Sequence, residues 1–133
     1  MAIILDADVV IRGEKGAFDL AAWIARHSNE SFAIAAITVA ELWHGVERAT
    51  PAHRVRRERY IKGVLDSLPI IPYSEATALE HARVWERLEA SGQMIGDYDL
   101  IVAATAMEYA SAVATFNKRH FERVQGLKVI EPK

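Results

Sequence analysis

The chain has 133 residues, a length typical of one domain that can bury a single hydrophobic core. It contains no cysteine, which excludes a disulfide framework and a zinc site made of thiolates. The formal net charge of −2 neither favours nor excludes a nucleic-acid partner, so the local charge distribution has to decide. No apolar stretch approaches the roughly 20 residues that span a bilayer, and no signal peptide is recognisable, so we expect a cytoplasmic protein with no membrane partner.

The first predicted strand, Ile3–Ile11, carries two carboxylates in an otherwise apolar run. The sequence IILDADVVI is typical of a strand that is buried on both faces, and Gly13 and Gly16 are expected to end it. Aspartate is disfavoured in strands and is costly to bury as a charge, so a carboxylate there usually has a partner, of which a cation is the strongest kind. Asp6 is therefore a candidate metal ligand.

Helices and strands alternate along the rest of the chain. The pattern predicts further strands at 32–37, 70–71, 111–116 and 127–130, and helices at 17–29, 53–68, 75–90 and 97–110. Thr38, followed three residues later by Glu41, has the spacing of a capping box that opens another helix, which Pro51 is expected to close. This alternation predicts an α/β fold with a mainly parallel central sheet flanked by helices, and we see one domain over residues 1–133.

Several acids are expected to converge at one edge of this sheet. In open parallel sheets ligands bind outside the carboxyl ends of the strands. Asp6 lies on the first strand, Glu41 one turn beyond the second, and Asp97 and Asp99 in the first turn of a later helix, where the helix dipole favours anions. Carboxylates without histidine or cysteine form a site that prefers Mg²⁺ or Mn²⁺ over zinc. Such a site suits phosphodiester hydrolysis.

Four segments of the chain resemble, in order and spacing, the PIN-domain ribonucleases, specifically the VapC type of toxin–antitoxin systems. These segments are ILDADVVI, TVAEL, DLIVAA and TFNKRHFERVQGLKVI. The resemblance covers essentially the whole chain and implies a PIN domain with Mg²⁺-dependent endoribonuclease activity, in which Mn²⁺ could replace Mg²⁺. It also implies an RNA substrate, a homodimer, and a VapB-like protein antitoxin that blocks the site.

The resemblance assigns roles to five residues of this sequence. Asp6, Glu41 and Asp99 match the acidic triad that holds the divalent ion, and Glu41 is also the candidate general base. Thr115 matches the threonine that follows the penultimate strand, where it would orient Asp6 or the nucleophile. Asn117 falls where many PIN domains carry a fourth acid. This departure lowers the charge of the site and puts a second tightly bound ion in question.

Two other acids are assigned supporting roles. Asp8 stands where the family more often has a small polar residue, and it would support Asp6 or contact the ion through water. Asp97 is interpreted as a helix cap or a supporting residue rather than as a ligand. Structural alternatives stay open for Glu41, which a capping box would explain completely, and for Asn117, which could be a turn residue.

A basic segment is the candidate contact surface for RNA. It combines five basic residues with one acid, Glu58, in a chain whose total charge is negative. Its basic residues are Arg54, Arg56, Arg57, Arg59 and Lys62. The segment predicts a phosphate-binding surface with Tyr60 available for stacking, or else a solvated helix face or a docking surface for an acidic or extended partner segment. Arg119 and Arg123, near the predicted site, are further candidates for RNA contact.

Two other functional classes remain as alternatives. Asp6-Ala-Asp8 after an apolar strand also resembles the nucleophile motif of haloacid-dehalogenase phosphatases, but Val9 and Val10 follow where that motif needs glycine and threonine. The second alternative is a PIN-fold RNA-binding module without catalysis, for which Asn117 is the only hint. The five histidines show no metal-ligand spacing, and His120, like the others, is interpreted as a surface or helix-packing residue.

Overall fold

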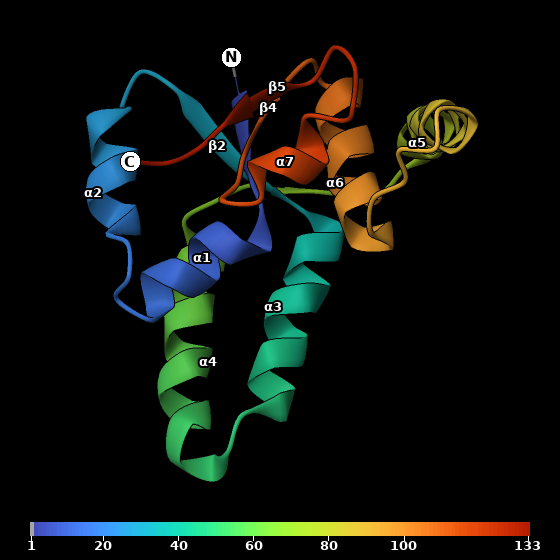
Figure 1. Cartoon of the computed structure of the whole chain (residues 1–133). Coiled ribbons are helices and arrows are strands. Elements are labelled where there is room, and N and C mark those ends of the chain that lie inside the picture. The colour runs from blue at the N-terminus through green and yellow to red at the C-terminus, as the bar shows by residue number, and fades with distance from the viewer. Residues whose placement is uncertain (1) are drawn as a thin grey trace.

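A five-stranded parallel sheet runs through the centre of the protein, whose computed structural model describes residues 2–133 (Figure 1). The strands are β1 (Ala2–Leu5), β2 (Ser31–Ala35), β3 (Ile70–Ile71), β4 (Ala112–Ala114) and β5 (Lys128–Ile130). Their order is β3-β2-β1-β4-β5, and every neighbouring pair is parallel. The prediction of a mainly parallel sheet is confirmed. All carboxyl ends therefore meet at one edge of the sheet, with β1 at its centre.

Seven helices cover the two faces of this sheet (Figure 1). They are α1 (Ala7–Glu14), α2 (Leu20–Arg26), α3 (Ala36–Arg48), α4 (Pro51–Asp66), α5 (Glu75–Ala90), α6 (Asp97–Glu108) and α7 (Lys118–Phe121). Ile3 and Leu5 of β1 pack into a cluster with residues of α1 to α4, whereas Ile4 packs with residues of α5 to α7. Because successive side chains of a strand point to opposite faces, the sheet is the middle of three layers. None of the described helices is long and apolar enough to cross a membrane.

The first segment differs from the predicted single strand. β1 ends at Leu5, and Asp6 caps helix α1 by accepting a hydrogen bond from the Ala7 amide at 2.9 Å. Val9 and Val10 are fully buried, but on a helix rather than a strand. An apolar run of this length does not distinguish a buried strand from a buried helix, and the prediction chose wrongly. Asp6 consequently lies at the end of the strand instead of within it.

The predicted capping box at Thr38 is also wrong. Helix α3 begins at Ala36, directly after β2, and its N-cap Ala35 makes no side-chain capping bond. Thr38 and Glu41 therefore lie inside the helix, which leaves the Glu41 carboxylate without a capping role. The helix ends at Arg48, and Pro51 is the first residue of α4, a position where a missing N–H has no cost.

The second half of the chain follows the prediction more closely. Ser74 and Thr77 form a reciprocal capping box at the start of α5, and the predicted range 75–90 is confirmed. The strand β3 also has its predicted bounds. Helix α7, which connects β4 to the last strand, was not predicted; it has four residues, too few for a periodic pattern.

We expect Gly13→Ala to destabilise the protein by about 1–2 kcal/mol, although alanine is the better helix former. A Cβ at Gly13 would collide with the Tyr60 hydroxyl, which donates a hydrogen bond to the Val10 carbonyl, and would lie 3.1 Å from the Leu20 Cβ. Gly63→Ala is the matched control, because a Cβ there meets open space in another helix; it should stabilise by about 0.5–1 kcal/mol. Urea denaturation of both variants tests this, and equal effects would contradict the clash.

Candidate active site

The two central strands place Asp6 and Thr115 side by side at the carboxyl edge. Leu5 of β1 is paired with Ala114 of β4, so the next residue of each strand emerges at the same level. The Asp6 amide donates to the Ala114 carbonyl at 2.9 Å, and the Thr115 hydroxyl donates to Asp6 Oδ2 at 2.8 Å. Asp6 is 5% exposed. The backbone register thus fixes a buried carboxylate whose orientation depends on Thr115.

Asp8 connects the first turn of α1 to the loop after β4 by a hydrogen bond. Its Oδ2 accepts a hydrogen bond from the Phe116 amide at 3.1 Å. The Asn117 amide donates to the Thr115 hydroxyl oxygen at 2.9 Å, so the same loop also holds the threonine that contacts Asp6. Arg12 lies 4.2 Å above the ring of Phe116. Asp8 therefore contacts the loop that carries Thr115, and its supporting role toward Asp6 stays a prediction.

Glu41 projects from α3 and has an unused buried oxygen. Its Oε1 is inaccessible to solvent and has no hydrogen-bond partner among the described residues. An unpaired buried oxygen of this kind is costly, and the Thr38 hydroxyl oxygen of the same helix is likewise unpaired, so α3 offers two oxygens that a group from outside the chain would satisfy. Glu41 also borders a cavity of about 280 Å³, whose other lining residues include His44 and Tyr98.

Asp99, Asn117 and His120 form the third part of the site. Asp99 lies in the first turn of α6, and its Oδ2 is 3.5 Å from His120 Nδ1. The same nitrogen of His120 is hydrogen bonded to the Asn117 side-chain amide at 2.8 Å. Sequence reasoning missed His120, which it interpreted as a surface or packing residue. Its spacing of one helical turn from Asn117 was the signal that could have found it.

Burial and mutual repulsion perturb three of these carboxyl groups. Burial, followed by the charge of Asp8, raises the pKa of Asp6 to about 7. Burial, followed by the charges of Asp99 and Asp8, raises the pKa of Glu41 to about 7. Burial also raises the pKa of Asp8, although the Phe116 amide and Arg12 oppose this. Since four acids act on one another, the site has a deficit of positive charge at neutral pH.

The donor set fits a divalent cation that keeps part of its water. No three of the described His, Asp or Glu side chains are already drawn together closely enough to hold an ion on their own. Mg²⁺, however, usually keeps several waters and is held by one or two carboxylates. The unpaired Glu41 oxygen and the raised pKa values of Asp6 and Glu41 both favour a positive charge at this place. The residues present therefore fit such an ion.

Asp97 does not join this group of acids. The N-cap of α6 is Gly96, so the interpretation of Asp97 as a helix cap is wrong. Asp97 is the first residue of the helix and is exposed, and its side chain makes no hydrogen bond or ion pair within residues 2–133. It contributes to the helix N-terminus only through its charge.

The basic segment on α4 is partly occupied by interactions within the chain. Arg57 forms an ion pair with Glu14 at 2.8 Å, and Arg54 forms one with Glu47 at 2.9 Å. Tyr60 is partly buried and donates to the Val10 carbonyl, so the expectation that it is available for stacking is wrong. Figure 1 shows α4 beside α3, on the opposite side of α1 from α6 and α7. Three basic residues of the segment remain exposed or only loosely paired, namely Arg56, Arg59 and Lys62.

We expect the metal-free protein to unfold at a lower temperature at pH 8 than at pH 5.5. The pKa values of Asp6 and Glu41 lie near 7 in the folded protein, above their ordinary values of 3.8 and 4.5. Between these limits the folded state binds more protons than the unfolded state, so stability falls as the pH rises through about 7. Calorimetry in EDTA tests this, and Mg²⁺ at pH 8 should restore stability. A melting temperature that rises with pH in EDTA would contradict it.

The fold, and the acidic residues at the carboxyl edge of its sheet, define an α/β protein with a carboxylate site suited to a divalent cation. Residues 3–127 match the family model of the PIN domain. The chain is 34% identical to VapC ribonuclease Y4jK of Sinorhizobium fredii over 98% of its own length and 96% of that protein. The chain therefore belongs to the PIN-domain family, and within it to the VapC group, as the sequence motifs predicted. This full-length match leaves nothing to favour the phosphatase alternative.

Solved structures show the same fold. VapBC2 of Rickettsia felis, crystallised with a DNA fragment from its promoter, superimposes with a TM-score of 0.90 at 23% identity and covers 100% of both chains. VapBC-5 of Mycobacterium tuberculosis, a member of a family of toxin–antitoxin systems, superimposes with a TM-score of 0.77 at 27% identity and covers 98% of both chains. The arrangement of the layers is therefore that of known VapC proteins.

Proposed function

We propose that this protein is a metal-dependent endoribonuclease and the toxin component of a toxin–antitoxin pair. The observation that carries the proposal is the buried, unpaired oxygen of Glu41, whose carboxyl is under the charges of Asp99 and Asp8, at the carboxyl edge of a PIN domain. The similarity to a VapC ribonuclease supports RNA as the substrate. A phosphodiester bond is also the kind of substrate on which carboxylate-held cations act.

Asp6, Glu41 and Asp99 would hold Mg²⁺, or Mn²⁺ in its place, directly or through water. When bound, the ion supplies a water that is nucleophilic at neutral pH and stabilises charge on the reacting phosphate. Thr115 fixes the orientation of Asp6 through its hydroxyl, and Asp8 holds the loop that carries Thr115. Glu41 is also the candidate general base, in which case it would hold the ion through one of the ion's waters and accept the proton of the attacking water.

The partners follow from the same family membership. Similar structures are complexes of VapB and VapC proteins, some of them bound to DNA. We therefore propose a VapB-like antitoxin and a homodimer for this chain. A ribonuclease of this kind would meet its RNA in the cytoplasm.

The test is cleavage of end-labelled transfer and ribosomal RNA by the purified, antitoxin-free protein with Mg²⁺, with Mn²⁺ and with EDTA. Discrete cuts that need the metal and disappear in Asp99→Asn support the proposal. Metal binding without cleavage of any RNA would mean that the substrate lies outside these two classes. Absence of both metal binding and RNA cleavage would contradict the catalytic proposal and favour the RNA-binding module.

We expect His120→Ala to weaken Mn²⁺ binding about 10-fold, because residues that orient metal ligands typically contribute this much. His120 contacts Asp99 and Asn117, so its loss frees both side chains. Arg119→Ala is the control: Arg119 is the exposed neighbour on α7, and its side chain makes no hydrogen bond or ion pair within the described chain. That variant should raise KM for RNA and leave Mn²⁺ affinity unchanged. The Mn²⁺ affinity of each variant is measured by titration followed by electron paramagnetic resonance. Equal affinities of His120→Ala and Arg119→Ala would refute the positioning role of His120.

A further inference from the structure

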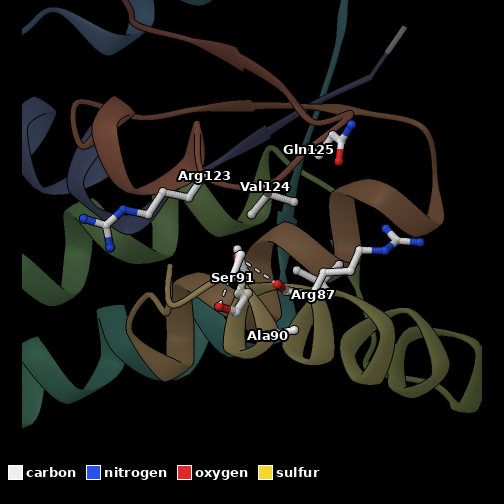
Figure 2. Close-up of a pocket in the computed structure, with 8 residues that line it drawn as sticks. Arg87, Ala90, Ser91, Arg123, Val124 and Gln125 are labelled. Atoms are coloured by element: carbon white, nitrogen blue, oxygen red, sulfur yellow. Dashed lines mark hydrogen bonds between the residues drawn. The ribbon is translucent and has the colours of Figure 1, made fainter.

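A second cavity, of about 400 Å³, lies between the end of α5 and the turn that follows α7 (Figure 2). Its apolar part is formed by Val84 and Leu88 of α5 and by Val124. Arg87 and Arg123 border it, and none of the described residues that line it is acidic. The volume is within the range of small-ligand sites in proteins, which is about 300–1,000 Å³. Its charge favours an anionic ligand.

Arg87 and Arg123 both have side-chain donors that are free to bind a ligand. Figure 2 shows them on opposite sides of Ser91 and Val124, with their guanidinium groups directed outward. Arg87 is exposed, and its side chain makes no hydrogen bond or ion pair with the described residues. Arg123 donates one hydrogen bond, from Nη1 to the Met94 carbonyl at 2.8 Å, and keeps its other donors. Both can therefore bind phosphate oxygens.

The cavity is joined to the candidate active site by two short connections. Arg123 follows His120, which contacts Asp99, by three residues, and the Arg123 amide donates to the His120 carbonyl. Met94, which Arg123 holds, belongs to the segment that leads directly into α6 and its Asp99. These connections place the cavity close to the acidic site.

We propose that this cavity binds one nucleotide of single-stranded RNA beside the cleavage site. Arg87 and Arg123, on opposite sides of the apolar floor, would contact phosphates of the strand before and after this nucleotide. The base then packs on Val124 and Leu88, with the Gln125 side chain at the rim as a hydrogen-bonding group. The inference rests on the proposed ribonuclease function, because it places the nucleotide on the path of that substrate.

The test compares Arg87→Glu with Arg83→Glu. Arg83 lies one turn earlier on α5, pairs with Glu80 at 2.9 Å and does not line the cavity, so it undergoes the same charge change outside the site. Binding of a fluorescein-labelled single-stranded RNA is measured in EDTA by anisotropy, and cleavage kinetics are measured in Mg²⁺. Arg87→Glu should weaken binding and raise KM about 10-fold, leave kcat within about 2-fold, and reduce the salt slope of binding by about 1.

Equal effects of the two variants on RNA binding would overturn the inference, because the charge of the surface alone would then explain them. Selective weakening by Arg87→Glu supports it, even in EDTA, where no cleavage occurs. If the wild-type protein binds the RNA but neither binds metal nor cleaves any RNA, the proposed nuclease function fails, and the binding comparison still decides the cavity. The two failures are therefore distinguishable.

Discussion

Replacing Asp6 with asparagine is expected to lower metal-dependent RNA cleavage about 100-fold or more and to raise the stability of the metal-free protein at pH 8. Asp6 is 5% exposed, and burial raises its pKa to about 7, so its charge at pH 8 destabilises the folded state. Asparagine is an equally good helix cap through its single amide oxygen, and its NH₂ group, in the position of Asp6 Oδ2, can donate to the Thr115 hydroxyl oxygen. It lacks the charge that would hold the ion. Activity and stability should therefore change in opposite directions.

Asp97→Asn is the matched control for this variant. Asp97 is an exposed carboxylate in the first turn of α6 that lies outside the acidic group, so the same chemical change there should leave both properties nearly unaltered. Cleavage rates in Mg²⁺ and melting temperatures in EDTA at pH 8 are the two readouts. Should Asp6→Asn lower both, the carboxylate would be structural, and the electrostatic account of the site would be wrong.

Phe121→Ala is expected to cost about 3–5 kcal/mol of stability, the largest effect of any single truncation that we predict. Phe121 is the largest fully buried side chain of the described residues, and it belongs to the same buried cluster as Ile4, Leu100 and Val113. It is also the last residue of α7, whose preceding residue is His120. Removing the ring leaves a cavity in the core and loosens the segment that contacts Asp99.

Val55→Ala serves as the control for Phe121→Ala. Val55 is 65% exposed on α4, so its truncation should change stability by less than about 0.5 kcal/mol. Urea denaturation gives both values. A cost below about 1 kcal/mol for Phe121→Ala would show that α7 is not anchored in the core in the way described here.

The chemistry of the site was predictable because its residues are unusual where they stand. Asp6 interrupts an apolar run, and its partners had to be cations or hydrogen-bond donors; the structure supplies Thr115 and Ala7 as donors. That Asp6 and Thr115 meet follows from the pairing of β1 with β4, which joins residues 109 positions apart in the sequence. Local patterns carry no information on such pairing. The family resemblance supplied it.

The errors have one physical origin. Val9 and Val10, like Thr38 and Glu41, lie in segments whose apolar pattern is complete in either of two local structures, and the sheet decides between them. The pairing of β1 with β4 ends at Leu5, and α1 begins at Ala7. β2 passes directly into α3, which begins at Ala36, before the predicted cap at Thr38. His120 escaped prediction for a similar reason, since its contact with Asp99 depends on how α7 packs on α6.

The central claim is that Asp6 and Glu41 bind a divalent cation. The most direct test measures metal binding by calorimetry in buffers of different ionisation enthalpy, which gives the number of protons released. Both carboxyls have a pKa of about 7 without metal, so an ion that binds them must displace protons at pH 7. The account predicts proton release on binding of Mn²⁺ at pH 7, little release at pH 9, and a smaller release at pH 7 in Asp6→Asn. Absence of binding, or binding with no proton release at pH 7, would contradict it.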